Sequence, residues 1–148
     1  MFTGIIEAQG MLVGKREEGT NVHLDVRAPF TEALQVDQSV AHDGVCLTVV
    51  AIDGDVYTVT AIEETLVKTH LGSCDVGHVF NLERCAVVGD RIDGHVVQGH
   101  VDTTGTLASV ESREGSWVLT IEHPQGPEWI TVPKGSIALA GISLTVVD

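Results

Sequence analysis

Short runs in which apolar and polar residues alternate occupy most of the chain. Apolar residues dominate every second position of residues 21–29 and of residues 116–124, and both runs end at a proline. Valine is abundant, and Gly, Asp or Pro bounds most runs. This pattern is typical of half-buried β-strands rather than of long helices. No apolar run reaches 18 residues, so no membrane-spanning helix is predicted.

The first part of the chain, residues 1–88, is predicted to hold five or six strands. Asp53-Gly54 separates the strands expected near Leu47–Ile52 and Val56–Ala61, and this dipeptide favours a tight hairpin turn. A further strand is expected near His78–Glu83. Six strands of this length close most easily into a small Greek-key barrel, which leaves no exposed edge.

One short helix is expected at about Glu63–Thr69. It follows Thr60 and Glu63, which have capping-box spacing. Glu64 and Lys68 would then lie four residues apart on its outer face, where an ion pair supports the helix.

The chain also repeats itself. Three blocks recur in the same order, the first two at an offset of 95 residues and the third at an offset of 97. These blocks are residues 3–12 and 98–107, 21–29 and 116–124, and 41–50 and 138–147. In the third, Gly-Val-Cys-Leu-Thr-Val-Val stands over Gly-Ile-Ser-Leu-Thr-Val-Val. This order predicts a tandem duplication.

The duplication predicts two β-barrel domains, residues 1–88 and residues 89–148. The expected fold class is therefore all-β, with tandem duplicated six-stranded Greek-key barrels and short helices. The second copy ends at Asp148, whereas the first continues for roughly 35 more residues beyond the matching point. The second barrel is therefore expected to be incomplete in this chain.

Charge excludes one class of partner. The chain carries 21 acidic and 8 basic side chains, a net charge of −13. This surface repels nucleic-acid phosphates, and no Lys/Arg cluster opposes the repulsion. The acidic excess either keeps an ordinary protein in solution or adapts it to a salty cytoplasm.

The three cysteines, Cys46, Cys74 and Cys85, are odd in number and widely spaced. That spacing fits neither a disulfide framework nor a CxxC zinc site. Free thiols in a reducing compartment are expected. Residues 1–4 show no secretory signal pattern, so the cytoplasm is the expected location.

Motifs of one known family span the chain in the right order. The first half holds Met1–Glu7, Gly44–Val49, Glu64–Leu66 and Asn81–Cys85, and the second half holds Gly89–Arg91, Asp93–His95, Gln98–Asp102, Lys134–Ser136 and Gly141–Val146. With these motifs the chain resembles the riboflavin synthases of the two-barrel type.

The resemblance implies a dismutation that needs no cofactor. Two molecules of 6,7-dimethyl-8-ribityllumazine would react, and a four-carbon unit would pass between them to give riboflavin and 5-amino-6-ribitylaminouracil. It also implies a homotrimer, with each site between the N-terminal barrel of one subunit and the C-terminal barrel of another. Two related barrels would hold two copies of one substrate face to face, and this proximity would supply much of the acceleration.

The site residues are carried over from the same motifs. The first pocket is expected to use Gly4, Ile5, Ile6, Cys46, Leu47, Thr48, Thr60, Ala61, Ile62, Glu63, Glu64 and Thr65. The second is expected to use Gly99, His100, Val101, Ser143, Leu144 and Thr145, with Lys134 reaching across from a neighbouring subunit. The catalytic candidates are Cys46, His100, Ser143 and Thr145.

Strand geometry supports part of this set. Cys46 and Thr48 are two residues apart, as are Ser143 and Thr145, so each pair faces one side of a strand. Cys46 could add to the substrate ring or orient it, although cysteine is also a common small buried residue. His100 is the acid/base candidate, because histidine titrates near neutral pH; the alternative is a surface histidine.

No metal site is expected. His95 and His100 are five residues apart, and a regular strand would place them on opposite faces, away from a shared ion with Asp102. Two departures from the family pattern occur in the repeated block: Asp43 stands where asparagine is frequent, and Ala140 where aspartate or asparagine is frequent. Both flank strands that are expected to contact substrate.

Two other functions remain open. Lumazine proteins keep the two-barrel fold but hold a lumazine as a fluorophore, without catalysis. An unrelated Greek-key transport or interaction barrel would leave the duplicated blocks unexplained. Cys46, His100 and Ser143 favour the enzyme.

Overall fold

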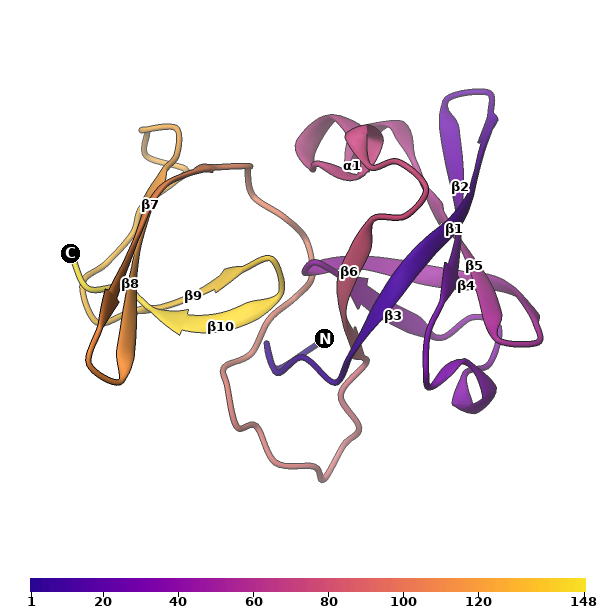
Figure 1. The fold of residues 1–148 in the computed structure, drawn as a ribbon, viewed down its shortest axis with the longest axis horizontal. Helices are drawn as coiled ribbons and strands as arrows, with labels where there is room; N and C mark the ends of the chain where they lie inside the picture. Colours follow the sequence, from indigo (N-terminus) through magenta and orange to yellow (C-terminus); the bar gives the residue numbers. More distant parts are fainter.

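A computed structural model describes residues 1–148 and shows a nearly all-β chain (Figure 1). Six strands form a closed barrel in the order β1-β2-β5-β4-β3-β6, with antiparallel neighbours throughout. The barrel strands are β1 (Ala8–Glu18), β2 (Asn21–Arg27), β3 (Ser39–His42), β4 (Val45–Asp53), β5 (Val56–Ala61) and β6 (Val79–Arg84). The predicted six-stranded barrel is confirmed.

Alternation along the strands fills the barrel. On β2, Val22, Leu24 and Val26 point inward and are buried, while the residues between them are partly exposed. Tyr57 and Phe80 are the largest fully buried side chains. Burial of each large apolar side chain stabilises the fold by about 1.5–3 kcal/mol. The inward side of every strand is thus occupied, and only outward-facing residues are free to bind a ligand.

The predicted short helix is present as α1 (Glu63–Lys68), and Lys68 Nζ lies 2.7 Å from Glu64 Oε1. The predicted capping box is wrong. The N-cap is Ile62, and no side chain caps the helix. Thr60 still belongs to β5, and its hydroxyl bonds the ring of His23 instead. Two single 3-10 turns complete the barrel, η1 (Thr31–Ala33) and η2 (Leu71–Ser73).

Four further strands form what we call the second unit. β7 (Thr106–Arg113) pairs with β8 (Ser116–Glu122), and β9 (Ser136–Leu139) pairs with β10 (Ile142–Thr145). The two hairpins share no strand pairing, so this unit is open, unlike the barrel. An incomplete second barrel was predicted, and the open unit agrees with it.

Irregular features of the barrel recur in the second unit at the offsets seen in the sequence. The register of β1 against β2 shifts between Leu12 and Gly14, and that of β7 against β8 shifts between Leu107 and Ser109. These bulges lie 95 residues apart.

The β3–β4 and β9–β10 turns also correspond. Each has two residues with positive φ, Asp43-Gly44 in the first and Ala140-Gly141 in the second. Consecutive positive φ angles define the hairpin turn that favours Asn or Asp followed by Gly. Asp43 therefore suits its turn, whereas the Cβ of Ala140 is strained there. The two departures from the family pattern thus act on backbone geometry.

Residues 1–7 precede the barrel, and residues 85–105 precede the second unit. These two segments cross between the barrel and the second unit. Phe2 and Val97 form an antiparallel bridge, with N–O distances of 2.7 and 3.0 Å. In Figure 1 the N-terminal segment lies between the barrel and the second unit. None of the helices has the length and apolar character needed to cross a bilayer.

Candidate functional site

A pocket of about 350 Å³ opens between β4, α1 and the segment that leads to the second unit. Its walls combine apolar, hydroxyl, thiol, imidazole and charged groups. The lining residues are Val45, Cys46, Glu64, Thr65, Lys68, Thr69, Gly99, His100 and Val101.

The alternation of β4 delivers Cys46 to this pocket. Val45 and Leu47 point into the barrel core, whereas Cys46 and Thr48 point outward. Leu47 was predicted to contact substrate, but its side chain is part of the core. The side chain of Ala61 is likewise fully buried, at the end of β5.

Gly99 brings His100 beside Cys46. The Cys46 backbone N–H donates a hydrogen bond to the Gly99 carbonyl oxygen at 2.8 Å. Gly99 has a φ of +86°, and a Cβ there would lie 2.6 Å from Cys46 Cβ. Only glycine fits this close approach. The next residues, His100 and Val101, therefore form the pocket wall opposite α1.

The equivalent contact occurs at the second unit. The Ser143 backbone N–H donates to the Gly4 carbonyl oxygen at 2.8 Å, and Gly4 has a φ of +75°. The prediction grouped Gly4, Ile5 and Ile6 with Cys46, whereas the structure places Gly4 against Ser143. The N-terminal segment contacts the second unit, and the segment around Gly99 contacts the barrel, so the two segments are exchanged.

Glu83 holds the N-terminal segment in this position. This buried carboxylate accepts hydrogen bonds from the Thr3 backbone N–H and hydroxyl, both at 2.6 Å, and from the Gly4 N–H at 2.9 Å. Three donors compensate its removal from water.

Helix α1 supplies the outer wall. Residues four apart share one helical face, and this spacing places Lys68 and Thr69 beside Glu64 and Thr65. The hydrogen bond and charge of Lys68 lower the pKa of Glu64, and Glu64 in turn raises the pKa of Lys68. Sequence reasoning missed Val45, Lys68 and Thr69, although the helical spacing could have indicated the last two.

Several predicted residues lie outside the lining of this pocket. The Ser143 hydroxyl is 2.7 Å from His95 Nδ1, within the second unit's contact with the N-terminal segment. His95 and His100 thus face different parts of the molecule. The other predicted residues that do not line this pocket are Thr48, Thr60, Ile62, Glu63, Lys134, Leu144 and Thr145.

Comparison with known proteins gives consistent results. Residues 3–85 and 98–148 match the family model described as the lumazine binding domain. The riboflavin synthase of Mycobacterium tuberculosis (strain ATCC 25618 / H37Rv) is 42% identical over 149 residues, covering 99% of this chain and 74% of that protein. The riboflavin synthase of Escherichia coli (strain K12) is 37% identical over 151 residues, covering 99% and 70%.

Among solved structures, LumP complexed with riboflavin superposes with a TM-score of 0.88 at 21% identity, over 100% of this chain and 81% of that one. LumP complexed with 6,7-dimethyl-8-(1'-D-ribityl) lumazine gives 0.85 at 22% identity, over 98% and 79%. Structural similarity to proteins of such low sequence identity establishes the fold of this chain. The barrel and the two-segment match define the class, a protein built on the lumazine-binding fold. With its identity to curated enzymes over nearly its whole length, the chain belongs to the riboflavin synthase family.

Proposed function

We propose that this protein is a riboflavin synthase and therefore a transferase. One 6,7-dimethyl-8-ribityllumazine would donate a four-carbon unit and leave as 5-amino-6-ribitylaminouracil, while the other would accept the unit and become riboflavin. The observation that carries the proposal is the juxtaposition of Cys46 and His100 in one pocket of a chain from this family. Because the exchange is between two identical molecules, no external oxidant or reductant is needed.

Cys46 and His100 are the proposed reactive groups of the first pocket. The Cys46 thiol faces the pocket and adds to the lumazine ring or orients it. The His100 imidazole, exposed on the opposite wall, moves protons to and from the substrate. General acid/base groups of this kind contribute about 10²–10⁴-fold in rate.

The second substrate molecule is proposed to lie near Gly4, Ile5, Ile6, Ser143 and Thr145. The repetition of the Cys46–Gly99 contact at Ser143 and Gly4 supports this assignment. It also supports residues 1–88 and 89–148 as tandem copies of one lumazine-binding domain.

Assembly into a homotrimer in the cytoplasm is part of the proposal. Three unpaired cysteines suit a reducing compartment. A neighbouring subunit would contribute Lys134, which is exposed in a turn of this chain. Sedimentation velocity measures the assembly directly.

A non-catalytic lumazine- or flavin-binding protein is the second candidate. The superposition on LumP with bound riboflavin or lumazine favours it. The two candidates differ in turnover, because a binding protein would hold the lumazine without forming riboflavin.

The test is a turnover assay with purified 6,7-dimethyl-8-ribityllumazine, followed by riboflavin absorbance. It is run on this chain and on a version extended at its C-terminus by the matching segment of a curated relative. We expect riboflavin formation by the extended version, and a loss of at least about 100-fold in Cys46→Ser and His100→Ala. Lumazine binding without any riboflavin would overturn the enzyme and leave the binding protein.

Matched controls come from the same chain. Cys85→Ser changes an exposed thiol and His123→Ala changes a histidine outside both pockets, and neither should lower turnover. Equal losses in the controls would mean that Cys46 and His100 are not the reactive groups.

A further inference from the structure

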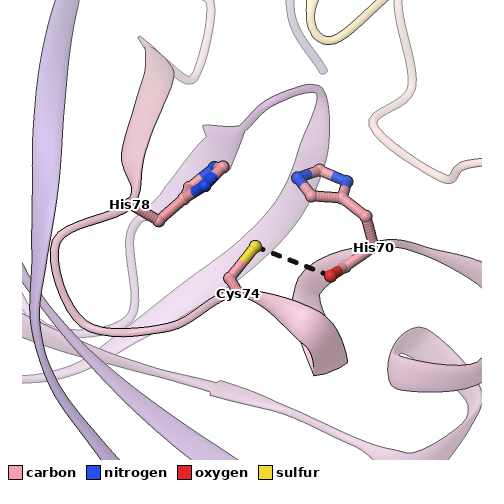
Figure 2. A group of neighbouring side chains, drawn as sticks. All are labelled: His70, Cys74 and His78. Atoms are coloured by element: carbon pink, nitrogen blue, oxygen red, sulfur yellow. Dashed lines mark hydrogen bonds between the residues drawn. The ribbon is translucent and has the colours of Figure 1, made fainter.

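A second group of chemistry-bearing side chains lies in the turn between α1 and β6. His70, Cys74 and His78 each offer a ligand atom, and these three atoms lie within 4.8 Å of one another. Figure 2 shows the two imidazoles and the thiol converging from either side of η2. The residues are spaced four apart, and η2 folds the segment so that they meet.

Asp43, which lies in the β3–β4 turn, contacts both imidazoles. Its Oδ2 lies 3.0 Å from His70 Nε2 and 3.1 Å from His78 Nε2. The Asn81 backbone N–H donates to the other carboxylate oxygen at 2.7 Å and orients the group. Because Asp43 contacts both rings at Nε2, the Nδ1 atoms are the nitrogens left for an ion. A carboxylate on the second ring nitrogen is the usual companion of metal-binding histidines.

Hydrogen bonds hold Asp43 and the imidazoles, whereas Cys74 packs as part of the barrel core. The polar contact of Cys74 Sγ is a 3.5 Å approach to the His70 carbonyl oxygen, and this is a weak interaction. The thiol is nevertheless buried within reach of both rings. A metal ion gives this sulfur a strong partner.

We propose that His70, Cys74 and His78 bind a transition-metal ion of the Zn²⁺ class, with Asp43 positioning the two imidazoles. Imidazole nitrogen and thiolate sulfur are the donors that Zn²⁺ prefers, whereas Mg²⁺ and Ca²⁺ require oxygen ligands. One thiolate and one carboxylate together balance the charge of a divalent ion. The proposal is independent of the reaction proposed above.

The geometry requires only a small contraction. Tetrahedral Zn²⁺ with bonds of about 2.0 Å to nitrogen and 2.3 Å to sulfur separates the donors by about 3.5 Å. The three donors would therefore close in by about 1 Å. An ion can enter past His70 and His78, whose side chains are 40% and 33% exposed, while the thiol stays shielded.

The bound ion would join three parts of the molecule. Thr69 lines the pocket directly before His70, and Asn81, which orients Asp43, donates its side-chain N–H to the Ala140 carbonyl oxygen of the second unit. Metal binding should therefore stabilise the pocket segment against the barrel and the second unit.

Cobalt titration tests the proposal. The reduced protein is stripped with a chelator and titrated anaerobically with Co²⁺, a coloured substitute for Zn²⁺. We expect one equivalent to produce a thiolate-to-cobalt charge-transfer band together with visible bands of low-coordinate cobalt. Zn²⁺ should remove both by displacement and raise the Tm by a few degrees, whereas Mg²⁺ should do neither. Absence of these bands at excess Co²⁺ would overturn the proposal.

Variants assign the ligands. Cys74→Ser should abolish the charge-transfer band, and His78→Asn should weaken binding at least tenfold. Asp43→Asn should keep the band but weaken binding roughly 10–100-fold, as expected for a positioning residue. Cys85→Ser and His123→Asn are the controls. A band that survives Cys74→Ser but disappears in Cys85→Ser would place the metal elsewhere and refute the site. If Cys74→Ser does not fold, the partly exposed His70→Asn and His78→Asn decide the question.

Discussion

At the scale of single residues, two buried polar groups, His42 and Glu83, have hydrogen-bond partners for their polar side-chain atoms. The fully buried His42 lies 3.1 Å from the Val40 carbonyl oxygen through Nδ1 and 2.8 Å from the Tyr57 hydroxyl through Nε2. Because a carbonyl only accepts, Nδ1 carries the proton and Nε2 accepts from Tyr57. Burial lowers the pKa of this ring from 6.5 to about 4, so the ring is neutral at pH 7.

Because His42 is buried in its neutral form, we expect the folded protein to lose stability at acidic pH. The unfolded chain binds the proton near pH 6.5 and the folded chain only near 4, so stability falls as the pH drops through this range, by about 3 kcal/mol in total. Tyr57 and Asp43 are the groups that face the ring or act on it by charge. Urea unfolding at pH 7, 6 and 5 measures the slope. His42→Gln should flatten it relative to the parent, and an unchanged slope would contradict the prediction.

Glu83 is the second such residue, and its removal should detach the N-terminal segment. Glu83→Ala leaves the Thr3 and Gly4 donors without their acceptor, and we expect the free energy of unfolding to fall by about 3 kcal/mol. Hydrogen exchange at the Ser143 amide, which depends on Gly4, should become faster. Glu7→Ala, which removes a partly exposed ion pair with Arg84, should cost less than about 1 kcal/mol. Equal costs for the two variants would disprove a special role for Glu83.

At the scale of elements, the exchanged segments build the pocket. The Cys46 and Ser143 strands each receive the segment that precedes the other set of strands, through a glycine with positive φ. At the centre, Gly44 and Gly141 approach so closely that a Cβ on either would lie 2.8 Å from the other's backbone nitrogen. The glycines therefore set how closely the barrel and the second unit pack.

Gly99→Ala and Gly115→Ala separate this packing effect from backbone strain. Both glycines have positive φ, but a Cβ at Gly115 meets nothing within 4 Å, whereas at Gly99 it meets Cys46 and Phe2. We expect Gly115→Ala to cost about 1–2 kcal/mol and to leave lumazine binding intact. Gly99→Ala should cost at least about 2 kcal/mol more and weaken binding. Urea unfolding and ligand fluorescence measure the two effects, and equal results would contradict the close contact.

At the scale of the whole molecule, the large net negative charge destabilises the compact folded state. The net charge of −13 is carried by 148 residues, and most of its acidic groups lie on the surface. Such an excess lowers the stability of the folded chain by self-repulsion, which salt screens. The open second unit, which is largely exposed, has little core to compensate.

Molar NaCl should therefore stabilise the protein. We expect a gain of about 1–2 kcal/mol, or roughly 2–8 °C in Tm, between low salt and 1 M NaCl. The variant Glu17→Lys/Glu32→Lys/Glu114→Lys changes the net charge from −13 to −7 (each replacement adds two charges) and should show a smaller gain. Stability that does not rise with salt would exclude adaptation to a salty cytoplasm.

The order of the elements could be predicted from the sequence, because the signals are local. Alternation along strands such as Asn21–Arg27, the Asp53-Gly54 turn and the Glu64–Lys68 spacing depend on neighbouring residues alone. The recurrence of Gly-x-[Cys/Ser]-Leu-Thr-Val in both halves likewise indicated the family. The capping box failed because pairing across the sheet kept Thr60 in β5 and bonded to His23.

The composition of the pocket was decided only by tertiary structure. Spacing placed Cys46 and Thr48 on one outward face, but no local pattern indicates that the segment at Gly99, and not the one at Gly4, crosses to Cys46. That choice depends on the Phe2–Val97 bridge and on the three hydrogen bonds that Glu83 accepts. Both are contacts between residues far apart in the chain. The convergence of His70, Cys74 and His78 on Asp43 arises in the same way, since closure of the barrel brings the β3–β4 turn against the segment before β6.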